Sequence, residues 1–74
     1  MDATKAFNLF HLAFRAASDP DTTKGDLREL SLSSDEVVRG AVVMNKSTPS
    51  DVISRMRKDE SFHVQECILA REAL

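Results

Sequence analysis

Apolar residues recur along this chain at the three- and four-residue spacing of amphipathic helices, and short polar runs separate the apolar segments. The first segment extends from Asp2 to about Ala17, and its aromatic residues Phe7, Phe10 and Phe14 stand at positions i, i+3 and i+7. This spacing places the three rings on one stripe of a helix. Other apolar residues widen the stripe to more than half of the circumference, so we expect this helix to be well covered.

Four shorter helices are predicted after the first, at about 23–32, 35–44, 49–58 and 61–73. At the start of the third helix, Ser33 and Glu36 stand at the spacing of a capping box, in which each side chain bonds a backbone N–H of the other residue. The fifth helix is expected to begin at Ser61. Its inward-facing candidates are Phe62, Val64, Cys67, Ile68 and Ala70.

The segment Val37–Met44 allows two interpretations. Valine is β-branched and common in strands, so a strand is the competing prediction. The apolar positions 37, 38, 41 and 42 follow the helical period instead, and polar capping residues flank the segment on both sides. We therefore expect a helix.

A tight turn between two helices is predicted at Asn45–Asp51. Asn45 is expected to close the third helix, because asparagine tolerates the left-handed backbone found just past a helix C-terminus. Thr48 is expected to be the N-cap of the fourth helix, with Pro49 at the first helical position, where no N–H is needed. Asp51 places a negative charge near the positive end of that helix.

The same pattern returns after 26 residues. Thr48 lies 26 positions after Thr22, and the apolar positions that follow each threonine match in character, as with Val38 and Val64. Extending this register backwards places Leu12 of the first helix on Val38. The chain therefore reads as half a unit followed by two helix–turn–helix units.

These units resemble short HEAT-like repeats, also called variant leucine-rich repeats. The second unit carries the opening Asn45–Pro49, the apolar slots Ile53 and Met56, and the closing slots Asp59 and Val64; the first unit carries Thr22, Leu27, Leu30, Val38 and Arg39. Two departures are Ser33 for the usual aspartate and Gln65 for the usual arginine. The resemblance covers about residues 12–70 and implies an all-α, right-handed superhelix of about five helices. It also implies a scaffold that binds proteins or nucleic acids.

Length and composition limit the functional classes to which the chain can belong. The 74 residues form one domain, 1–74, whose 42% hydrophobic and 30% charged content is ordinary for a soluble globular protein. The single cysteine excludes an internal disulfide and suits a reducing compartment, so we expect a cytoplasmic protein without a signal peptide. No apolar run reaches the roughly 18 residues that cross a membrane. The net charge of −2 argues against general affinity for nucleic acid.

Catalytic and metal-binding constellations are not evident in the sequence. His63 and Glu66 stand at i and i+3 and offer two metal ligands, but a third ligand is missing nearby. Cys67 is expected to be a small buried residue. With only two glycines there is no phosphate-binding loop, and no paired carboxylates sit in an apolar setting. We therefore expect a protein that is not an enzyme and needs no cofactor.

The sequence favours binding of another protein, in the role of a small regulator or inhibitor, for which an origin in a phage or mobile element suits the size. The partner surface is expected on the third and fifth helices, with Val43 and Leu69 as an apolar centre and Arg39, Lys46 and Gln65 around it. Without an evident polar cap at the C-terminal helix, a homodimer through that helix is a second expectation. Arg55, Arg57 and Lys58 form a candidate basic patch for an acidic partner or a phosphate backbone. The alternative function is nucleic-acid binding through this patch together with Arg39 and Lys46.

Overall fold

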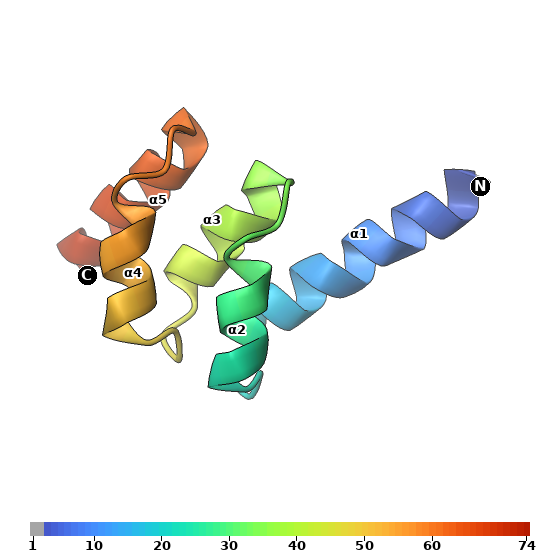
Figure 1. Ribbon diagram of the computed structural model, residues 1–74, viewed down its shortest axis with the longest axis horizontal. Helices are drawn as coiled ribbons and strands as arrows, with labels where there is room; N and C mark the ends of the chain where they lie inside the picture. The colour runs from blue at the N-terminus through green and yellow to red at the C-terminus, as the bar shows by residue number, and fades with distance from the viewer. Residues whose placement is uncertain (1–2) are drawn as a thin grey trace.

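The computed structural model describes the backbone of residues 3–74 and the side chains from residue 10 onward. Within residues 3–74 it contains five helices and no strand (Figure 1). The helices are α1 (Ala3–Ser18), α2 (Lys24–Leu30), α3 (Glu36–Met44), α4 (Ser50–Met56) and α5 (Phe62–Ala73). The prediction of an all-helical chain is confirmed, and the segment for which a strand was the alternative is α3. The predicted helix start at Asp2 and the side chain of Phe7 lie outside the described part.

The helices form two layers. α3 packs against α1 and α5, so these three helices form one row, and α1 extends from this row toward the N-terminus (Figure 1). α2 packs against α1 and α3, and α4 packs against α5; both lie on the same side of the row. None of the described helices combines the length and the apolar character that crossing a membrane requires.

The core lies between the two layers and consists mainly of small and β-branched side chains. Its buried members are Ala17, Val38, Val42, Val43, Val52, Ile53, Met56, Val64 and Ile68. On α5 only Val64 and Ile68 are buried, one helical turn apart. The prediction that Phe62 and Ala70 face inward was wrong. Phe62 is 79% exposed and Ala70 is exposed, because both lie away from that stripe. Cys67 is half-buried beside it.

Helix positions recur after 26 residues, as the sequence pattern predicted. α2 and α4 both contain seven residues, and their first residues, Lys24 and Ser50, are 26 positions apart. α3 and α5 begin at Glu36 and Phe62, at the same offset.

Threonine hydroxyls make the first repeated contact. The Thr22 Oγ1 donates to the carbonyl of Ala16 at 2.6 Å, and the Thr48 Oγ1 donates to the carbonyl of Val42 at 2.7 Å. Each hydroxyl thus gives a second donor to a carbonyl near the end of the preceding helix, which also accepts from the backbone N–H three residues later. The predicted role of Thr48 as N-cap was wrong: the N-cap residue of α4 is Pro49, and its side chain makes no capping hydrogen bond.

A second repeated contact joins each unit to the one before it. The Asn45 Nδ2 donates to the carbonyls of Ala17 and Asp19, both at 2.8 Å. One unit later, the Arg71 Nη1 donates to the carbonyls of Val43 and Asn45, at 2.7 and 2.9 Å. Asn45 and Arg71 therefore donate to equivalent carbonyls in successive units, although their side chains differ in length.

Two predicted helix ends differ from the structure. Asn45 follows α3 in extended backbone, with φ −77° and ψ 120°, because its buried amide is drawn inward to the α1 carbonyls. The N-cap of α3 is Asp35 rather than Ser33; its carboxylate accepts from the N–H of Val37 at 2.8 Å. The fifth helix was expected to begin at about Ser61; this residue is the N-cap of α5, and its hydroxyl accepts from the N–H of Val64.

We expect Thr48→Val to lower the free energy of unfolding by about 0.5–1.5 kcal/mol, because the buried Val42 carbonyl then loses its side-chain donor and keeps the N–H of Asn45. Thr48→Ser, which keeps the hydroxyl, should retain most of the stability. Urea denaturation followed by circular dichroism measures both.

Thr48→Asp separates this role from helix capping. Aspartate is a good N-cap but cannot donate to a carbonyl when ionised, so this variant should be at least as unstable as Thr48→Val at pH 7. A Thr48→Asp protein as stable as the wild type would contradict the assignment.

Candidate interaction surface

The apolar centre predicted from Val43 and Leu69 does not form. Val43 is completely buried, whereas Leu69 is 63% exposed, although the two residues occupy the same position in successive units. Val43 belongs to the core and lies beneath the next unit, and no described helix follows α5 to cover Leu69. The prediction that Val43 lies at the surface was wrong.

Arg39 is held by an ion pair and hydrogen bonds within the chain, so it is not a free surface cation. Its Nε and Nη2 donate to the carboxylate of Asp59 at 2.8 and 3.2 Å, and its Nη1 donates to the carbonyl of Ser33 at 2.8 Å. Both charged side chains are largely shielded from solvent. The hydrogen bonds from Arg39 lower the pKa of Asp59 below its ordinary value and raise the pKa of the guanidinium.

Gln65 makes the corresponding contact one unit later. Its Nε2 donates to the carbonyls of Asp59 and Arg57 at 2.7 and 3.0 Å, at the turn that precedes its own helix. Arg39 reaches the carbonyl of Ser33, which lies 26 positions before Asp59. Gln65 therefore keeps the hydrogen bond to a turn carbonyl that Arg39 makes in the preceding unit, but it does not reproduce the ion pair.

The predicted basic patch is largely engaged within the chain. Arg55 donates to the hydroxyl of Ser31 at 2.7 Å, and Arg57 forms an ion pair with Glu72. Lys46 and Lys58 are exposed on different turns, after α3 and α4 respectively.

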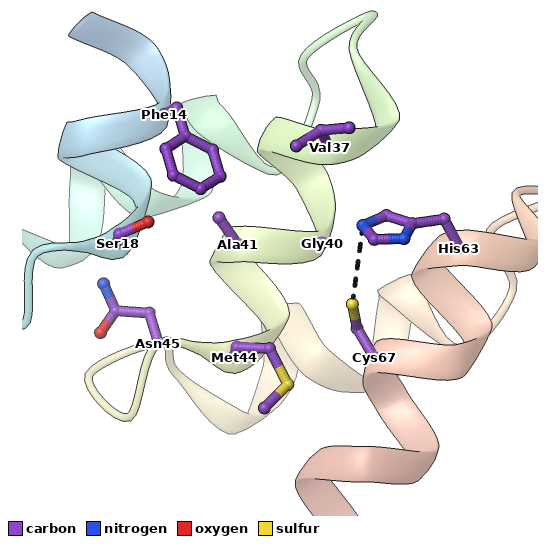
Figure 2. A pocket seen from close by; sticks show the side chains of 9 residues that line it. All are labelled: Phe14, Ser18, Val37, Gly40, Ala41, Met44, Asn45, His63 and Cys67. Carbon is purple, nitrogen blue, oxygen red and sulfur yellow. Dashed lines mark hydrogen bonds between the residues drawn. The ribbon is translucent and has the colours of Figure 1, made fainter. Parts of the chain in front are cut away.

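A groove on the α1–α3–α5 row offers a better-formed surface. The groove is open to solvent and has a volume of about 410 Å³, and its lining is mainly apolar. Figure 2 shows the side chains around it: Phe14 and Ser18 from α1, Val37, Gly40, Ala41 and Met44 from α3, Asn45 just after α3, and His63 and Cys67 from α5. The sequence does not predict this groove, because its lining comes from three helices whose packing only the fold reveals.

Gly40 determines how closely α5 approaches α3. A Cβ built on Gly40 would lie 2.6 Å from the His63 Nε2 and 3.1 Å from the Cys67 Sγ. The missing side chain thus leaves room for these two residues to pack over the middle of α3, as Figure 2 shows.

Apolar side chains around the groove remain accessible. Phe14, Val37 and Met44 are each partly exposed. The Phe10 ring stacks with the Phe14 ring at a centroid distance of 6.1 Å, which continues the apolar surface along α1. Large side chains left open around one cavity, rather than scattered singly, are typical of an interaction site.

The groove does not hold an activated nucleophile. The Cys67 Sγ lies 3.8 Å from the His63 Nε2. Burial, and then the charge of Glu66, raise the pKa of the thiol, so it stays protonated at neutral pH, whereas reactive cysteines have lowered pKa values. Among the described residues, no three potential ligands are grouped to hold a metal ion.

The ion pair of Arg39 and Asp59 predicts a pH-dependent stability. The pKa of Asp59 is lower in the folded chain than the roughly 3.9 of an unfolded chain, so the pair stabilises fully above that value and its contribution disappears as the pH falls through the folded pKa. We expect Asp59→Asn to lower the free energy of unfolding by about 1–2 kcal/mol at pH 6.

Urea denaturation at pH 6 and at about pH 2.5 measures this difference, which should shrink at the lower pH, because below about 3.9 the unfolded chain takes up the proton before the folded chain does. Asp51→Asn is the matched control, because its pair with Arg28 is exposed and should change stability little at either pH. An equal loss for Asp59→Asn at both pH values would contradict the assigned pair.

Comparison with known proteins does not place the chain in a family. No protein-family model, no curated protein and no solved structure matches it. Its function is therefore inferred from the groove, the charge distribution and the repeat.

Proposed function

We propose that this chain is a non-enzymatic protein-binding module whose groove receives the apolar face of a helix from another protein. The observation that carries the proposal is the apolar cavity of about 410 Å³, bordered by partly exposed Phe14, Val37 and Met44. A small regulator or inhibitor that acts by occupying its target fits such a surface. The groove lies on α3 and α5, the helices that the sequence favoured, and on α1, but none of the partner-binding residues predicted from the sequence lines it.

An amphipathic helix suits the groove for a geometric reason. Such a helix presents apolar side chains at i, i+3, i+4 and i+7 along one stripe, and short grooves between helices commonly receive them. Ser18 and His63 add polar groups among the lining residues. An apolar centre with polar groups around it is the usual anatomy of a protein interface.

The architecture we propose is a short HEAT-like right-handed superhelix. It is supported by the 26-residue recurrence of helix starts and of side-chain contacts with carbonyls. The row of α1, α3 and α5 would then be the inner layer, and successive units would join their inner helices into one binding surface.

Nucleic-acid binding is less well supported. Arg39 and Arg57 already pair with carboxylates, and the net charge is −2. Binding to a phosphate backbone needs several cations free to replace its counterions.

Selection from a displayed library of peptides, each roughly 15 residues or about four helical turns long, tests the proposed function. Selected peptides should carry bulky apolar residues at helical spacing and bind the wild-type chain, as measured by fluorescence anisotropy. Met44→Glu places a charge at the rim, and Ala41→Phe fills the cavity. Each should weaken binding by at least about tenfold, equivalent to about 1.4 kcal/mol.

Leu32→Glu is the control, because Leu32 is a highly exposed apolar residue outside the groove. This variant should bind the selected peptides like the wild type, and circular dichroism should show all three variants folded. Selection that yields no binder, or binders that tolerate both Met44→Glu and Ala41→Phe, would overturn the proposal.

A further inference from the structure

His63 and Cys67 bring two metal-binding atoms together at the groove. They stand four positions apart on α5, so they share one face of this helix, and the His63 Nε2 lies 3.8 Å from the Cys67 Sγ (Figure 2). His63 is exposed and Cys67 is half-buried, so an ion can reach both atoms from solvent. The sequence offered Glu66 as the partner of His63 in a metal site, whereas the fold pairs His63 with Cys67.

Gly40 determines where these two atoms lie. A Cβ built on Gly40 would be 2.6 Å from the His63 Nε2 and 3.1 Å from the Cys67 Sγ, so both atoms pack directly over the middle of α3. A larger residue at this position would displace the imidazole. The pair is therefore held by packing between two helices and does not depend on α5 alone.

Met44 supplies a third sulfur or nitrogen ligand on the facing helix. It stands one helical turn after Gly40, is partly exposed, and extends on the Cys67 side of α3 (Figure 2). Because methionine is unbranched and flexible, its thioether can turn toward the pair.

The separation of the two ligand atoms on α5 suits a site with few ligands. With metal–sulfur and metal–nitrogen bonds of about 2.3 and 2.0 Å, an ion between these atoms would meet them at about 125°. This angle is near the roughly 120° of a trigonal site and wider than the roughly 109° of the tetrahedral sites that zinc prefers. Among the described residues, no third histidine, cysteine or carboxylate is grouped with the pair to complete a zinc site. Thiolate and thioether sulfur instead select Cu(I).

The charge of the site also favours a monovalent ion. Cysteine binds a metal as the thiolate, so the thiol proton is released to solvent when the sulfur–metal bond forms. Cu(I) on one thiolate leaves no net charge, whereas Zn²⁺ would leave one positive charge. The lining of the groove is mainly apolar, and an unpaired charge in such surroundings is costly.

We propose that His63, Cys67 and Met44 form a three-ligand site for Cu(I) at the groove. Two ligands come from α5 and one from α3, so a bound ion would cross-link these helices. The site does not rest on the proposed binding of a helix, because its ligands all belong to this chain.

Anaerobic titration with Cu(I), in competition with a chromophoric Cu(I) chelator, tests the site. The wild type should bind one ion per chain without a change of oligomeric state in sedimentation velocity. Cys67→Ser should abolish binding. His63→Phe keeps the thiol and should weaken binding by at least about tenfold, because one metal bond is lost. Met44→Leu should weaken it by about threefold or more, since a thioether is often the long, weak ligand of a copper site.

Gly40→Ala tests the geometry without removing a ligand, because its Cβ would displace the imidazole of His63. It should weaken Cu(I) binding by at least about tenfold. Gly25→Ala is the matched control, since a Cβ there meets nothing within 4 Å, and it should bind like the wild type. His11→Phe is the control for His63→Phe, because His11 does not line the groove. Circular dichroism should show every variant folded.

Three results would overturn the proposal: His63→Phe or Gly40→Ala binding Cu(I) as tightly as the wild type, Met44→Leu leaving the affinity unchanged, or one ion shared between the cysteines of two chains. The first would mean that the thiol binds alone, and the last that the site is not within one chain. Cu(I) binding is measured without a peptide, so this proposal and the proposed function can fail separately.

Discussion

The structure depends on side chains that satisfy the carbonyls at the ends of α1 and α3. Helix C-termini leave carbonyls without helical partners, and burying them unpaired costs about 1–3 kcal/mol each. Here each end receives one hydroxyl from the turn that follows it and one amide or guanidinium from farther along the chain. These bonds fix how far one unit is displaced from the next. The position of the core valines and the width of the groove follow from that displacement.

Local signals in the sequence predicted the helices but not their partners. The period of the apolar residues and the 26-residue recurrence located the five helices that the structure describes, with the start of the last one within a residue of Ser61. Thr48 was misassigned because a hydroxyl both accepts and donates, and residue type alone does not reveal which group it meets. Val43 and Leu69 are alike in sequence; only the presence of a following unit separates a buried residue from an exposed one.

The groove could not be predicted from the sequence, for a related reason. Its central element is Gly40, and a single glycine within a helical segment indicates a weakened helix rather than a contact site. The role of Gly40 becomes clear only from the fold, in which His63 and Cys67 approach it closely. The lining residues also come from three helices, so no short motif contains them.

The short outer helices limit how the molecule can be divided. α2 and α4 have only seven residues each, well below the roughly 12–15 residues that an isolated helix needs to be even marginal in water. Each persists because a neighbouring unit holds its turns and covers its apolar side. Removing α5 would take away Arg71 from the end of α3 and Gln65 from the end of α4 together. We therefore expect the five described helices to unfold as one cooperative unit, and a cut between them should leave fragments that fold only when they are brought back together.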